Sequence, residues 1–168
     1  PTSEAIRGGG LGHWRSMLAA GVNCTLGTDG PAVDYSVDMV EQMKACCYLQ
    51  GVRYGDPTAV PPRIALEMAT INAARALGMD RSIGSLEPGK QADLLLFDRD
   101  RPHLRMVRDP VTALVRATRG ADARLVMVNG RVAYEDGHFP MLPQADRVLE
   151  DARTRATAIA KAAGFEPL

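Results

Sequence analysis

A short, largely apolar run near the N-terminus limits what this chain can fold into more than any other feature. Residues 22–26 (VNCTL) are followed by Gly27, and the tetrapeptide Thr28-Asp29-Gly30-Pro31 then interrupts regular structure. A short apolar run bounded by turn residues is typical of a buried strand. Such a strand needs neighbouring strands at its edges and other elements over its faces, so the rest of the fold has to supply both.

The composition is that of a soluble globular protein. The chain has 168 residues, of which 46% are hydrophobic, and 20 basic residues balance 20 acidic ones. Without clusters of Lys and Arg, we expect no nucleic-acid partner. No apolar stretch approaches the ~20 residues that span a bilayer, and no secretory signal is recognisable, so we expect no membrane association. The odd number of cysteines (Cys24, Cys46 and Cys47) predicts buried, reduced thiols in a cytoplasmic protein.

Local patterns predict most of the secondary structure. Asn129-Gly130 lies between two strand-like runs and predicts a β-hairpin, because both turn positions need positive φ. Pro61-Pro62 and Gly78 bound an apolar periodic segment, as expected for the two ends of a helix. The remaining expectations are helices over 14–20 and 36–50, a strand over 92–97, a strand or helix over 111–118, and a helix from Pro143 onward.

Few side chains offer catalytic chemistry. His13, His103 and His138 form no H-x-H or H-x-x-x-H pair, and the sequence holds no G-x-S-x-G nucleophile motif. The adjacent Cys46 and Cys47 lack a plausible histidine partner. We therefore expect the histidines at loop or surface positions and the two cysteines as packing residues on a helix.

Asp29 is the candidate that stands out. It follows the end of the expected strand at residues 22–26, which is where α/β barrels present catalytic groups. A partly desolvated carboxylate at such a place prefers a metal ion or a cationic partner. The alternative is that Asp29 forms a turn or caps a helix, since Thr-Asp-Gly is frequent in turns. The local pattern leaves both interpretations open.

Four stretches, taken together, resemble the amidohydrolase superfamily. They are residues 20–30 (AGVNCTLGTDG), 65–78 (ALEMATINAARALG), 83–94 (IGSLEPGKQADL) and 126–131 (VMVNGR). Each is modest alone, but their order over residues 1–138 is specific. The resemblance is to the cytosine-deaminase-like branch, which contains hydrolytic deaminases and triazine hydrolases.

The resemblance implies an α/β fold built from a (β/α)₈ TIM-like barrel and a small β-sandwich, with both chain ends contributing to the sandwich. This sequence is similar to the C-terminal part of such an enzyme. Residues 1–80 then correspond to the end of the barrel, with its last strand and the following helices. Residues 81–140 correspond to the sandwich segment, shared with a missing N-terminal segment, and 141–168 to a C-terminal helix.

By the same resemblance, Asp29 corresponds to the catalytic aspartate that ligates the metal and accepts a proton from the metal-bound water. The expected cofactor is a divalent metal, zinc in the first place and iron as the alternative. The family's histidine ligands have no counterparts here, and one aspartate falls short of the roughly three protein ligands of a catalytic zinc. The metal is therefore expected to bind only with ligands from the missing N-terminal part. Val33-Asp34 departs from the polar pair that the family often has there.

The function that follows is hydrolysis of a C–N bond, by deamination or amide cleavage, in a small heterocyclic substrate through a metal-activated water. The chain alone is expected to be inactive. Its expected partners are the substrate, the N-terminal half of the same enzyme, and further copies in a homo-oligomer. The alternative is a non-catalytic assembly module derived from the same fold, which the 3-4 spacing of apolar residues in the C-terminal helix would serve.

Overall fold

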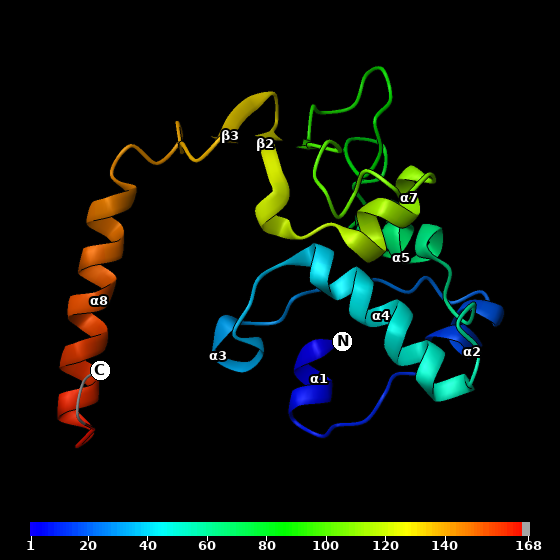
Figure 1. Cartoon of the computed structure of the whole chain (residues 1–168), viewed down its shortest axis with the longest axis horizontal. Helices are drawn as coiled ribbons and strands as arrows, with labels where there is room; N and C mark the ends of the chain where they lie inside the picture. The colour runs from blue at the N-terminus through cyan, green and yellow to red at the C-terminus, as the bar shows by residue number, and fades with distance from the viewer. Residues whose placement is uncertain (166–168) are drawn as a thin grey trace.

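The computed structural model describes residues 1–165 of the chain. Helices dominate its first part, and a small antiparallel sheet and one long helix follow (Figure 1). The first helices are α1 (Thr2–Ile6), α2 (Trp14–Ala19), α3 (Pro31–Asp34) and α4 (Met39–Tyr54). The helix expected over 36–50 is thus confirmed as α4. It begins after Asp38, whose Oδ1 accepts hydrogen bonds from the amides of Val40 and Glu41.

The single helix expected between Pro61 and Gly78 is in fact two, α5 (Pro62–Ala69) and α6 (Ile71–Ala76). They meet at Thr70, whose φ of −129° and ψ of −96° lie outside the helical range. The Thr70 hydroxyl donates to the carbonyl of Leu66 at 2.7 Å. A β-branched residue whose hydroxyl bonds to the backbone favours such a bend, which periodicity alone does not reveal.

The hairpin at Asn129-Gly130 is confirmed. β2 (Ala123–Val128) and β3 (Arg131–Glu135) pair antiparallel across it, and β1 (Leu94–Phe97) pairs with the other edge of β2. Asn129 and Gly130 have φ values of 49° and 72°, as a tight two-residue turn requires. The 111–118 segment is helical, comprising α7 (Pro110–Thr112) and a π-helical turn over Ala113–Ala117.

Residues 22–26 form no strand, so this prediction is wrong for the chain as described. A strand exists through hydrogen bonds to a neighbour, and residues 1–165 place no other strand beside this segment. The expected α/β class is therefore only partly matched: the described chain is mainly helical, with one three-stranded antiparallel sheet. A single extended segment cannot build a parallel sheet on its own.

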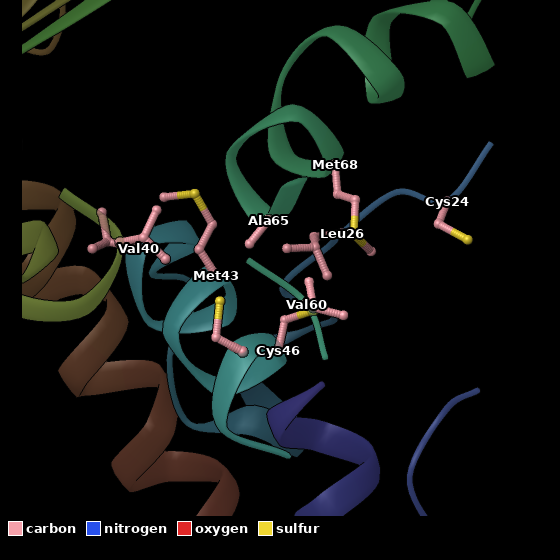
Figure 2. Close-up of a cluster of buried hydrophobic side chains, with 10 residues drawn as sticks. Cys24, Leu26, Val40, Met43, Cys46, Val60, Ala65 and Met68 are labelled. Atoms are coloured by element: carbon pink, nitrogen blue, oxygen red, sulfur yellow. The ribbon is translucent and has the colours of Figure 1, made fainter. Parts of the chain in front are cut away.

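The hydrophobic core lies where residues 24–26 cross α4 and α5 (Figure 2). Leu26 lies close to Met68 of α5, which is fully buried, and Cys24 is 5% exposed farther along the same segment. The core residues are Cys24, Leu26, Val40, Met43, Cys46, Cys47, Val60, Ala65, Met68 and Val115. The expectation that the cysteines are packing residues is confirmed, since all three are free and buried.

The long helix α8 (Ala145–Ala162) stands apart from the rest of the chain (Figure 1). The helix expected from Pro143 onward is confirmed, yet none of its residues is buried. Leu149 and Ile159 of its apolar stripe are 68% and 69% exposed. None of the helices in residues 1–165 is both long and apolar enough to cross a membrane.

The three core thiols should be inert in the folded protein. Burial, aided by the neighbouring Cys47, raises the pKa of Cys46 to about 12, and burial also raises the pKa values of Cys24 and Cys47. The thiolate is the reactive form, and a pKa near 12 leaves only about one Cys46 in ten thousand ionised at pH 8. A chromogenic disulfide reagent at pH 8 should therefore titrate three thiols in urea and none within minutes in the native state.

Met106→Cys serves as the control for this experiment, because Met106 is highly exposed and the introduced thiol should react at once. Native cysteines that react as fast as this introduced one would contradict the described core.

Candidate functional site

Asp29 lies in the exposed loop that joins residues 24–26 to α3. Its φ of 61° is left-handed, a conformation that costs a non-glycine residue on the order of 1 kcal/mol. The Asp29 Oδ1 atom accepts a hydrogen bond from the Gly30 amide at 2.8 Å, and the Thr28 hydroxyl donates to the Asp29 carbonyl at 3.1 Å. Gly30, not Asp29, is the N-cap of α3. The side chain thus stabilises its own turn, while the other carboxylate oxygen has no hydrogen bond within residues 1–165.

The segment leading to Asp29 is attached to α5 and α6 by hydrogen bonds. The Leu26 amide donates to the carbonyl of Met68 at 3.0 Å. Asn72 of α6 donates from Nδ2 to the Cys24 carbonyl at 3.3 Å and accepts at its own carbonyl from Asn23 Nδ2 at 3.0 Å. These bonds replace part of the pairing that neighbouring strands would give.

Asn72 is a residue that sequence reasoning missed. It is buried, and Arg75 Nη1 donates to its Oδ1 at 3.1 Å, so the orientation of the amide is set on both sides. The only signal in the sequence is a polar residue beside the apolar positions of a helix. Such a residue must find hydrogen-bond partners when it is buried, but the sequence does not say which ones.

The three histidines lie apart from this site, as expected for loop and surface positions. His13 receives a hydrogen bond from Arg53 Nη2 at its Nε2, at 2.6 Å. His103 lies 2.9 Å from the carboxylate of Asp122. His138 lies after β3, where its backbone pairs with Glu135. All three side chains are exposed.

The described residues do not form a metal site by themselves. Within residues 1–165, no three His, Cys, Asp or Glu side chains come together so that they could hold a metal ion. Asp29 is a suitable oxygen ligand, but a catalytic zinc needs about three protein ligands. The three cysteines are buried in the core, and burial raises the pKa values of their thiols, which disfavours the thiolate that a metal would need. Any metal centre that uses Asp29 therefore needs more ligands than residues 1–165 bring together.

An open groove of about 570 Å³ lies elsewhere, between the α5–α6 pair and the sheet. Its walls are mostly apolar, and Asp29 is not among the lining residues. Leu77 and Leu86 on its rim are largely exposed. An exposed apolar surface of this kind is typical of a contact with further protein, not of a site for a polar substrate.

Comparison with protein families matches residues 1–133 to the amidohydrolase family. The 5-methylthioadenosine/S-adenosylhomocysteine deaminase of Moorella thermoacetica is 44% identical over 142 residues, which are 84% of this chain and 33% of that protein. The 5'-deoxyadenosine deaminase of Methanosarcina acetivorans is 40% identical over 156 residues, which are 93% of this chain and 35% of that protein.

Solved structures of related enzymes also resemble the chain in fold. A zinc-bound adenosine deaminase from Xanthomonas campestris superposes with a TM-score of 0.86 at 28% identity, covering 93% of this chain and 36% of that one. Atrazine chlorohydrolase from Arthrobacter aurescens, complexed with zinc, gives 0.80 at 27% identity, covering 89% and 33%. The chain thus spans about a third of the length of the relatives that it matches.

The 168-residue chain on its own should hold no stoichiometric transition metal, because its described residues bring no further ligands to Asp29. The measurement is elemental analysis after purification and dialysis against a weak chelator. The Asp29→Asn variant is the matched control and should give the same background. About one tightly held zinc per chain, lost in that variant, would show that the chain alone completes the site.

Proposed function

Because the chain belongs to the amidohydrolase family, we propose that it is the C-terminal part of a metal-dependent hydrolase that cleaves a C–N bond in a small heterocyclic substrate. The observation that carries the proposal is the family match over residues 1–133, which includes the loop bearing Asp29. The deaminases at 44% and 40% identity favour deamination. The bond cleaved would then be the one that joins the amino group to the adenine ring of a nucleoside.

In this proposal Asp29 is the contribution of the chain to the catalytic centre. Its carboxylate supplies one ligand to a divalent metal, zinc with iron as the alternative, and accepts a proton during the reaction. The zinc named in the two related structures supports this choice of metal. A divalent ion supplies the chemistry by lowering the pKa of a bound water to about 7. The remaining ligands belong to the part of the protein outside this chain.

We assign residues 1–80 to the end of a barrel, 81–140 to a sandwich segment and 141–168 to a C-terminal helix. The last three residues lie outside the described range. The N-terminal part of the same enzyme is the proposed partner, and the apolar groove beside Leu77 and Leu86 supports it, since the surface is open here. We also propose that the complete enzyme is a homo-oligomer. A cytoplasmic location is in keeping with the three free thiols.

One observation favours the alternative function of a non-catalytic assembly module. The apolar stripe of α8 is exposed throughout, so this helix offers a surface to another protein. The catalytic proposal accommodates the same observation if the missing part of the enzyme covers α8. Metal content and turnover of the complete protein separate the two functions.

In the complete enzyme, Asp29→Asn should lower kcat by several orders of magnitude while the melting temperature stays near that of the wild type. The change removes a charged ligand and a base but keeps the shape of the side chain. The relatives suggest 5'-deoxyadenosine as the assay substrate, with loss of the adenine absorbance as the signal.

Glu87→Gln is the matched control for Asp29→Asn. The Ser85 hydroxyl and then Lys90 hold the pKa of Glu87 below its usual value, and this carboxylate lies in an exposed turn away from Asp29 in the sequence. The Glu87→Gln variant should keep kcat within about threefold of the wild-type value. Near-normal turnover in Asp29→Asn would remove Asp29 from the catalytic centre.

The chain should also depend on its partner for solubility and metal content. Co-expression with a polypeptide carrying the N-terminal two thirds of such an enzyme should give a soluble complex that contains metal. The chain alone should bind a dye that fluoresces on apolar surfaces, since Leu77, Leu86 and Leu149 are exposed. A chain that is monomeric, unfolds cooperatively and binds no dye would instead be an independent domain.

A further inference from the structure

The loop that carries Asp29 is attached at both ends, and its second attachment involves side chains that the proposed function does not use. The first attachment is the segment 24–26 on α5 and α6, described above. The second is Asp34, the last residue of α3, whose side chain is only 5% exposed although it is an acid. Between the two attachments, most residues are exposed or half-buried.

Asp34 is held by Gln42, a fully buried residue in the first turns of α4. The Gln42 Nε2 donates to Asp34 Oδ2 at 2.7 Å and to the Thr2 hydroxyl at 2.6 Å. Its Oε1 accepts from the backbone amide of Thr2 at 3.3 Å. Both donors and the acceptor of this amide are therefore in use, which leaves it one orientation.

A short sequence of hydrogen bonds links Asp34 to the carboxylate of Asp29. Within α3 the Asp34 amide donates to the Gly30 carbonyl at 3.1 Å, so the position of Asp34 determines that of Gly30. The Gly30 amide in turn donates to Asp29 Oδ1 at 2.8 Å. Asp29 and Tyr35, at the two ends of this turn, both have positive φ. A non-glycine residue keeps that conformation only where its surroundings hold it.

We propose that Gln42 is a positioning residue, which sets the direction of the Asp29 carboxylate through its hydrogen bond to Asp34. This inference rests on the proposed role of Asp29. The buried amide–carboxylate bond is directional, whereas the apolar packing around it is not, so it can select one loop conformation out of several. Misplacement of a reacting group by about 1 Å can cost up to a hundredfold in rate.

The same helix offers a matched control in Gln50. It is also fully buried on α4, and its Nε2 donates to the Gly12 carbonyl at 2.8 Å while its Oε1 accepts from the Arg15 amide at 3.3 Å. It attaches the chain before α2 and does not touch the Asp29 loop. Gln42→Met and Gln50→Met therefore remove equivalent buried amides and differ in the loop that they release.

The experiment compares these two variants in the complete enzyme. Hydrogen exchange of the peptide covering residues 27–34 should be at least tenfold faster in Gln42→Met and unchanged in Gln50→Met. With 5'-deoxyadenosine as the probe, kcat should fall by about ten- to a hundredfold in Gln42→Met with KM changed less than threefold. Gln50→Met should also lower the melting temperature but keep kcat within about threefold.

A paired exchange guards against simple misfolding. Asp34→Asn combined with Gln42→Glu exchanges donor and acceptor but keeps a buried hydrogen bond between the two side chains. The double variant should therefore restore slow hydrogen exchange and normal kcat, whereas Gln42→Glu alone should show fast exchange and a lower kcat. Equal effects of Gln42→Met and Gln50→Met on the loop and on kcat would overturn the inference, as would failure of the paired exchange. If Asp29→Asn retains turnover, the proposed function fails instead, and the exchange rates still decide whether Gln42 holds the loop.

Discussion

The attachment of residues 24–26 to α5 and α6 is the interaction on which the rest of this structure depends. The side chains of Cys24 and Leu26 enter the core, and the Leu26 amide bonds to the carbonyl of Met68. This segment has no strand neighbours in residues 1–165, so without these contacts its backbone would have no fixed place. The loop with Asp29 follows directly, and its position is inherited from this attachment.

Buried amide side chains provide the orientation that apolar contacts lack. Asn72 bonds to residues 23 and 24, Gln42 bonds to α3 and α1, and Gln50 bonds to the chain around Gly12. Hydrophobic burial stabilises many similar arrangements, whereas a buried amide is stable only when its donors and acceptor meet partners. In this chain, segments without regular structure are therefore located mainly by side chains on helices.

The chain also leaves apolar surface uncovered, which is consistent with the greater length of its relatives. The groove between α5–α6 and the sheet is open, and α8 has no buried residue. The matching relatives are about three times as long. The helices and strands of the chain are arranged as in the related adenosine deaminase, with a TM-score of 0.86, although about two thirds of that protein has no counterpart here.

Features that depend on near neighbours along the chain could be predicted from the amino-acid sequence. The Asn129-Gly130 pair predicts the hairpin, because its turn needs positive φ at both positions, and the helix expected over 36–50 is found as α4. Asp29 was found as the candidate because its motif occurs in a specific order with three others. Three features could be seen only in the folded chain: residues 22–26 form no strand, Thr70 separates α5 from α6, and Gln42 bonds to Asp34 and Thr2. The reason is physical: turns and caps are satisfied within a few residues, whereas strand pairing and buried amides depend on partners that the fold brings from far along the chain.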